Sequence, residues 1–345
     1  MEQSAGELSL PTAPTVEAMK STFATPQFYV KEIGEAALGL LTSGQRGKAL
    51  AVVSHAAYLF SDQDELFWLA AENVPLHRRC IQLSGPLPRL SVGTPFNANG
   101  HRLIVGSGTD LDFSQASIWK SPPISSDDAV AVTDLPERLC AVIPILDDLP
   151  APVGFGSLIS EIMFIASNQK APRSPKTSAV ILTHALPAVQ EIAAACLAHD
   201  FPRILEQADA LAGLGEGLTP SGDDFVGGLL FCRMILQSLY ADVLNLEFPD
   251  LLGFIKNLKP STNIISHTLL KDHAEGHAID TLHQFVNALL TGQSLDNVRL
   301  IASKLIQIGH STGWDLLTGV LTGMLLAFRI SEPVIIYPSS QNSTG

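Results

Sequence analysis

The spacing of hydrophobic positions divides the chain into two parts. Between residues 30 and 120, short apolar runs are separated by Gly, Pro and Asn at turn-like intervals, a pattern typical of β-strands. The runs that indicate strands are 49–60, 65–70, 80–83, 89–92, 102–105 and 117–120. This part of the chain is therefore expected to form a small sheet or barrel.

From about residue 127 the apolar positions recur over stretches of helical length. The predicted helices are 135–146, 156–166, 179–199, 202–211, 223–240, 262–275, 279–290, 295–308 and 315–329. Pro136 and Pro144 weaken the prediction for the first of them. The expected fold class is α+β: a loose tail at 1–27, a β-rich domain at 28–126, a mostly α-helical domain at 127–332 and a frayed tail at 333–345. An exposed loop is expected at 168–176.

Composition narrows the classes of function. The chain has 345 residues, 46% of them hydrophobic, and its net charge of −13 would repel a polyphosphate backbone or an anionic membrane. Its four cysteines lie far apart, as expected of free thiols in a reducing cytoplasm. The apolar stretches 225–241 and 316–328 are predicted to be buried helices rather than membrane spans. We therefore expect a cytoplasmic protein with neither nucleic acid nor membrane as a partner.

The most informative segment is a glycine-rich loop that leads into a predicted helix. Its glycines, hydroxyls and acids are Gly213, Gly215, Gly217, Thr219, Ser221, Gly222, Asp223 and Asp224. Alternating glycines permit positive φ and leave N–H groups uncovered, and the start of a helix favours anions. We therefore expect the loop to bind a phosphate, a carboxylate or a developing oxyanion. It matches neither the Walker A loop, which needs a lysine, nor the G-x-G-x-x-G motif.

A structural alternative remains open for this loop. Ser221 with Asp224 resembles a capping box, and Gly213 is placed to end the preceding helix. Because capping and ligand binding can coincide at one helix start, the sequence does not separate them.

A second segment repeats the pattern. Its residues are Gly309, His310, Ser311, Thr312, Gly313, Trp314 and Asp315. Both segments place a hydroxyl, a glycine, any residue and an aspartate before an apolar helix, by internal duplication or by convergence on one geometry. We expect the two helix starts to face each other, with Asp315 close to Asp224. Helix glycines at 227, 228, 319 and 323 would permit close approach of the two helices.

The acids allow three interpretations. Asp223 and Asp224 could hold Mg²⁺, accept from the NH₂ of an amide or carbamoyl ligand, or cap and brace the helix. The NH₂ interpretation is favoured, because the loop already supplies N–H groups for the oxygens of such a ligand. Mg²⁺ is the one candidate cofactor. A zinc site at His273 and His277 is disfavoured, because the H-E-x-x-H order of a zinc-binding helix is absent.

These segments together resemble the AllH family. The resemblance rests on the glycine-rich loop, on the stretch Thr262-x-x-x-Ser266 with Ala274 and Gly276, and on the segment Gly309 to Asp315. It implies a subunit of the heteromeric oxamate carbamoyltransferase of anaerobic allantoin breakdown, which works with two partner subunits. It also implies a reversible reaction in which phosphate attacks the carbamoyl group of oxalurate, giving oxamate and carbamoyl phosphate.

The function predicted is a subunit of a carbamoyl- or acyl-transfer enzyme that acts on small carboxylate or carbamoyl metabolites. The candidate catalytic residues are Asp223, Asp224, His310 and Asp315, and the candidate substrate- and phosphate-binding residues are Gly213, Gly215, Gly217, Thr219, Ser221, Gly222, Ser266, Ser311, Thr312 and Gly313. The alternative is a non-catalytic subunit that binds or senses such a metabolite. Turnover by the chain alone, compared with turnover when partner subunits are added, discriminates between them.

Overall fold

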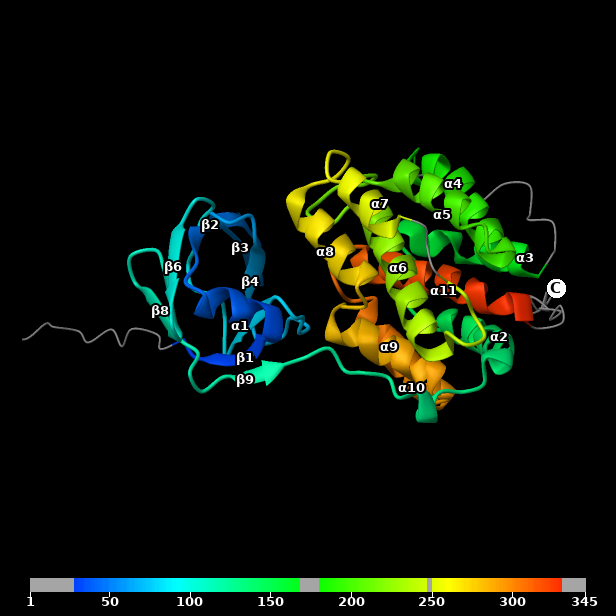
Figure 1. Cartoon of the computed structure of the whole chain (residues 1–345), viewed down its shortest axis with the longest axis horizontal. Helices are drawn as coiled ribbons and strands as arrows, with labels where there is room; N and C mark the ends of the chain where they lie inside the picture. The colour runs from blue at the N-terminus through cyan, green and yellow to red at the C-terminus, as the bar shows by residue number, and fades with distance from the viewer. Residues whose placement is uncertain (1–27, 168–179, 247–249, 331–345) are drawn as a thin grey trace, which may run out of the picture.

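The computed structural model describes residues 28–167, 180–246 and 250–330. The two predicted tails and the predicted loop at 168–176 lie outside these residues. Within them the fold is α+β, with a curled sheet followed by a helical part, as expected from the sequence (Figure 1).

The N-terminal part is a single mixed sheet of nine strands in the order β8-β7-β6-β2-β3-β4-β5-β1-β9. The strands are β1 (Val30–Gly34), β2 (Arg46–Val52), β3 (Ala56–Ser61), β4 (Leu66–Ala70), β5 (Cys80–Leu83), β6 (Pro95–Asn99), β7 (Arg102–Val105), β8 (Thr109–Asp112) and β9 (Ser117–Trp119). Neighbouring strands are antiparallel except at β4–β5 and β1–β9. Helix α1 (Glu35–Thr42) buries Ala37 and Leu41 in the core that the sheet encloses.

Five of the six runs predicted to be strands contain strands, and the prediction was incomplete. The apolar run at 49–60 is two strands, β2 and β3, joined by a tight turn in which the Val53 N–H donates to the Ala56 carbonyl. Residues 89–92 form no strand. The strands β1, β6 and β8 are additional; β6 hides only Phe96 and Ala98 from solvent, so its apolar pattern is too short to predict a strand.

The C-terminal part is helical. It contains α2 (Leu135–Leu146), α3 (Ile159–Ala166), α4 (Val180–Ala198), α5 (Phe201–Leu211), α6 (Ser221–Tyr240), α7 (Leu251–Asn257), α8 (Ile264–Ala274), α9 (Asp280–Leu290), α10 (Leu295–Leu305) and α11 (Thr312–Met324), with a 3₁₀ turn, η3 (Gly154–Leu158), before α3 and another, η4 (Leu325–Ile330), after α11. Helices α6 and α11 cross the middle of this part (Figure 1). Both are buried along most of their length, as the sequence predicted.

Prolines do not prevent α2 from forming. Pro136 lies in the first turn, where its missing N–H is not needed, and Pro144 lies in the last turn. The predicted helix at 135–146 is therefore confirmed.

Helix α4 is long and apolar enough to cross a membrane by length and composition alone. In this fold it packs on α5 and α3, and its buried residues include Leu182, Val189 and Ile192. These contacts are those of a core helix.

The sheet and the helical part are joined by a buried ion pair. The Arg79 guanidinium, just before β5, donates hydrogen bonds of 2.6 and 3.0 Å to the two carboxylate oxygens of Asp272 in α8. Trp68 of β4 lies in an apolar cluster with Leu269 of the same helix.

Candidate functional site

The glycine-rich loop and the second loop lie against each other at the starts of α6 and α11. The Thr219 hydroxyl is 3.1 Å from the Thr312 hydroxyl, and the Ser221 hydroxyl is 3.2 Å from that of Ser311. The paired residues are at least 90 positions apart in the chain. The prediction that the two helix starts face each other is therefore confirmed.

The two helices also pack through matching glycines. A Cβ on Gly228 would overlap the carbonyl oxygen of Leu316, and a Cβ on Gly319 would overlap that of Phe225. Each glycine therefore meets the carbonyl three residues before the other glycine. This reciprocity is what a local two-fold relation between α6 and α11 requires.

The same relation holds where each helix begins. A Cβ on Gly222 would overlap the Leu211 carbonyl oxygen at the end of α5, and a Cβ on Gly313 would overlap the Leu305 carbonyl oxygen at the end of α10. The units α5–α6 and α10–α11 thus share this close contact between the first turn of the second helix and the end of the first helix. The pattern repeated in the sequence therefore corresponds to a repeated contact in the structure.

The glycine-rich loop has the backbone conformation that its glycines predict. Gly213, Gly215 and Gly217 all have positive φ, of 72°, 132° and 95°. Gly213 follows the end of α5, as the capping alternative proposed for it. The Gly222 N–H donates to the Leu214 carbonyl at 2.8 Å, so this donor is used inside the loop.

The capping box proposed for Ser221 and Asp224 is not formed. Helix α6 begins at Ser221 with Pro220 as its N-cap, so Ser221 lies inside the first turn. Its hydroxyl faces Ser311 instead. The Ser221 hydroxyl is therefore directed at the second loop, and the Asp224 carboxyl is hydrogen-bonded by the hydroxyls of Thr312 in the second loop and Thr219 in the first.

Asp223 connects the loop to α8. Its Oδ1 accepts a 2.8 Å hydrogen bond from the Gly213 N–H, and its Oδ2 accepts from the hydroxyls of Thr262 and Ser266. The Ser266 bond is 2.7 Å long, and both Ser266 and Asp223 are buried. Of the three interpretations of the acids, bracing is the one these contacts favour for Asp223.

Asp224 and Asp315 form a buried pair of acids. Burial first, and then the charge of Asp315, raise the pKa of Asp224 well above its usual value. Burial raises the pKa of Asp315 to about 6, against hydrogen bonds from the Phe155 N–H and the hydroxyls of Ser311 and Ser221. The expected proximity of the two acids is confirmed. A carboxyl group whose pKa is raised to about 6, as that of Asp315 is, is suited to proton transfer.

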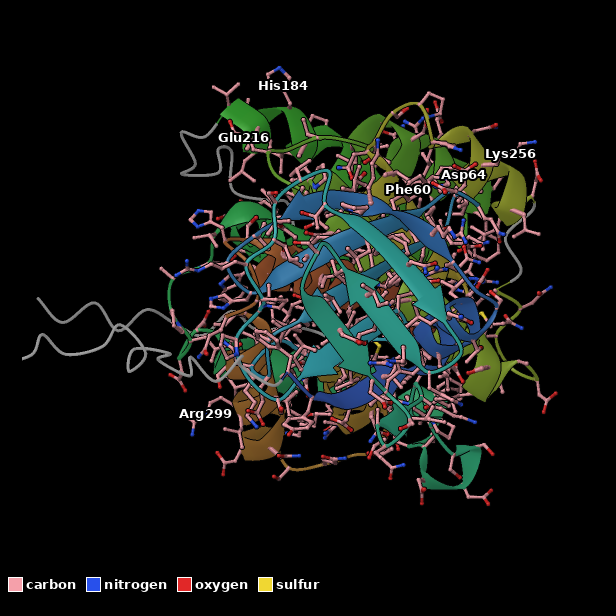
Figure 2. The ribbon with its side chains drawn as sticks, turned by 90° about the vertical axis from the view of Figure 1, so that its left-hand side faces the viewer. Phe60, Asp64, His184, Glu216, Lys256 and Arg299 are labelled. Carbon is pink, nitrogen blue, oxygen red and sulfur yellow. The ribbon has the colours of Figure 1, made fainter. Side chains whose placement is uncertain are left out.

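The remaining candidates lie around this pair. His310 is exposed and lies near enough to Asp315 to lower its pKa. Glu216, in the middle of the glycine-rich loop, is exposed and lies near the edge of the molecule in Figure 2. Gly217 faces open space. His273 is buried, and burial lowers its pKa to about 4.

Two contributors to the site were missed at the level of sequence. Tyr58, on β3 of the sheet, lies close enough for the charge of Asp224 to help raise its pKa, after burial, to about 12. Phe155, in η3, donates its N–H to Oδ1 of Asp315 at 2.6 Å. Neither residue lies in a motif, and each is brought to the site by tertiary packing, so no local signal marks it.

The described part of the chain contains no group of three or more His, Cys, Asp or Glu placed to hold a metal ion. Both oxygens of Asp223 are already engaged, which leaves Asp224 and Asp315 as the acids with an oxygen to offer. A Mg²⁺ bound by the adjacent pair Asp223 and Asp224 is therefore disfavoured.

The fold and this site define an α+β protein with a polar, acid-containing site between two repeated helix starts. Residues 211–324 match the family described as oxamate carbamoyltransferase subunit AllH, and this confirms the resemblance to that family. The matched segment includes the glycine-rich loop, the second loop and the whole of α6 and α11. No solved structure matches the chain.

Replacing Asp223 by alanine is expected to lower the free energy of unfolding by about 2 kcal/mol, because three donors lose their acceptor. Thermal or urea unfolding of the full chain measures the loss. Asp209→Ala, at an exposed position of α5, is the matched control and should change stability by less than about 0.5 kcal/mol. Equal effects of the two substitutions would show that Asp223 does not brace the loop.

Proposed function

We propose that the chain is a subunit of a cytoplasmic carbamoyltransferase, and that the paired helix starts bind the carbamoyl ligand and phosphate. The observation that carries the proposal is the juxtaposition of Thr219 and Ser221 with Thr312 and Ser311 around two buried acids. The family matched over residues 211–324 is named for a subunit of oxamate carbamoyltransferase. Its name fits a chain that works with partner acyl-transfer subunits.

The reaction depends on positioning of the two reactants rather than on covalent catalysis by a protein side chain. Phosphate attacks the carbamoyl carbon of oxalurate, and oxamate leaves as the nitrogen of its amide takes up a proton. Two reactants held together and donors aimed at the developing oxyanion account for most of the acceleration that such a site can give. Hydroxyls from both loops and N–H groups at two helix starts are the donors proposed here.

In this proposal the acids take different roles. Asp223 braces the loop through Gly213, Thr262 and Ser266. Asp224 and Asp315 face the ligand, and Asp315, with a pKa raised by burial to about 6, is the candidate for proton transfer. A buried acid of this kind beside the loops favours an enzymatic role over that of a purely binding subunit.

The test is phosphate-dependent breakdown of oxalurate by the full chain, alone and with its partner subunits. We expect turnover with the partners present, and a loss of at least about tenfold in Gly215→Val. The valine would be strained at φ 132°, and its Cβ would lie 2.6 Å from the Ser221 nitrogen. Glu216→Ala, at the exposed neighbouring position, is the control and should retain full turnover. Turnover unaffected by Gly215→Val would contradict the proposal.

Chelation separates the interpretations of the acids. If Asp224 accepts from an NH₂ group, turnover should be unchanged by a chelator of divalent cations. Loss of turnover with chelator and its return with Mg²⁺ would favour the metal interpretation instead.

A further inference from the structure

The carboxyl groups of Asp224 and Asp315 each retain an oxygen without a partner. Asp224 is 5% exposed and Asp315 is 0% exposed. Among the residues that the structure describes, Oδ2 of each makes no hydrogen bond. Because buried polar atoms are almost always paired, an unpaired carboxyl oxygen at each of two helix starts that contact each other indicates a place for polar groups of a ligand.

The two carboxyl groups have different surroundings. Oδ1 of Asp315 accepts from the Phe155 N–H at 2.6 Å, and an N–H group can only donate. Asp224 is hydrogen-bonded by the hydroxyls of Thr312 and Thr219, which can either donate or accept. The fixed N–H donor favours the charged form of Asp315, whereas the hydroxyls tolerate a protonated Asp224.

Two buried carboxylates this close do not both stay ionised, because their repulsion is strong where water is excluded. The charged and titratable groups around the pair do not remove this repulsion from Asp224. Asp223 adds further negative charge on the same helix, and Tyr58, whose pKa is raised to about 12, faces it from the sheet as a neutral phenol. The charge of His310 lowers the pKa of Asp315.

We propose that Asp224 and Asp315 hold a single proton at neutral pH and together recognise the amide group of a carbamoyl ligand. Asp224 carries the proton and donates through it to the carbonyl oxygen of the ligand. Asp315 is ionised and accepts from the NH₂ group. The identity of the ligand class rests on the function proposed above, whereas the shared proton does not.

The complementarity is specific for an amide. A carboxylic acid beside a carboxylate presents one donor and one acceptor, and an amide presents one acceptor and one donor of matching geometry. A carboxylate or phosphate at this point would be repelled by the negative charge of Asp315. The hydroxyls and N–H groups of the two loops are left for the anionic part of the ligand.

The proton itself is tested without any ligand. Infrared spectroscopy of the full chain at pH 7 should contain the carbonyl band of a protonated carboxyl group that disappears in Asp224→Asn and remains in Glu216→Gln. Circular dichroism shows whether each variant is folded. An unchanged band in a folded Asp224→Asn would overturn the shared proton.

Recognition of the amide is tested by calorimetry with oxamate and with pyruvate, which has a methyl group in place of NH₂. Oxamate should bind the full chain at least about tenfold more tightly than pyruvate, since pyruvate leaves the Asp315 acceptor unpaired. Because Asp315 loses its charge below a pKa of about 6, oxamate affinity should fall about tenfold between pH 7 and pH 5. Asp315→Asn should lose both the preference and the pH dependence.

A second comparison separates the donor role of Asp224 from packing. Asp224→Asn keeps an N–H donor at this position, so it should bind oxamate at least about tenfold more tightly than Asp224→Ala. Equal affinities in these two folded variants, or equal binding of oxamate and pyruvate by the wild-type chain, would overturn the recognition. If oxamate does not bind but the infrared band is present, the proposed function fails and the shared proton stands. If oxamate binds and turnover occurs but the infrared band is absent, the shared proton fails and the proposed function stands.

Discussion

Replacing Gly228 or Gly319 by alanine is expected to lower the free energy of unfolding by about 3 kcal/mol. A methyl group at either position would overlap a backbone carbonyl oxygen of the facing helix, that of Leu316 or of Phe225. Backbone atoms cannot rotate aside as a flexible side chain can, so α6 and α11 would have to separate. Because the loops that pair Thr219 with Thr312 lie at the starts of these helices, ligand binding should weaken as well.

The control for this prediction is another helical glycine. Gly39 lies on the exposed side of α1, and a Cβ there would meet open space. Gly39→Ala should therefore raise the free energy of unfolding by about 0.5–1 kcal/mol through helix propensity. Urea unfolding of the three variants gives the comparison. Stability of Gly228→Ala and Gly319→Ala within about 1 kcal/mol of the wild type would show that close packing of α6 and α11 is not required.

Replacing Arg79 by methionine is expected to cost about 3–5 kcal/mol of unfolding free energy. Asp272 is 0% exposed, and the substitution would leave its carboxylate buried without the guanidinium that binds both of its oxygens. Although burial raises it, the pKa of Asp272 is held below its usual value by Arg79. The stability that this carboxylate contributes is therefore present at neutral pH and is lost as the pH falls below the usual aspartate range.

Two further variants make this result specific to the buried pair. The double variant Arg79→Met with Asp272→Leu removes both charges and should recover most of the loss. Arg203→Met breaks only exposed pairs with Glu191 and Glu206 and should cost less than about 1 kcal/mol. An Arg79→Met variant as stable as Arg203→Met would show that the ion pair between the sheet and α8 is not needed.

The helical part, apart from α7, was predictable because its signal is local. Helix α2 was predicted from Leu135 to Leu146 and α10 from Leu295, since long apolar periodic stretches carry their own pattern. Strands β6 and β8 were not predicted, because a strand of four or five residues with alternate side chains exposed offers only one or two apolar positions. Their pairing is decided by partners distant in the chain.

The site, like the fold, could be predicted only in part. The repeated loops predict that Asp224 and Asp315 lie close together, because one short pattern occurs before both helices. The different role of Asp223 depends on Thr262 and Ser266 of α8, which only the fold brings to it. The same holds for Tyr58 and Phe155, whose contributions arise from the sheet and from η3. Local pattern therefore identifies the helix starts, and tertiary contacts assign roles within them.

The paired starts of α6 and α11 are proposed to bind the carbamoyl ligand. A crystal structure of the full chain grown with oxamate tests it most directly. We expect oxamate between the two loops, with its amide group against Asp224 and Asp315 and its carboxylate within hydrogen-bond distance of the Thr219, Ser221, Ser311 or Thr312 hydroxyls. Oxamate bound elsewhere on the chain, with the space between these loops filled by protein side chains, would contradict it.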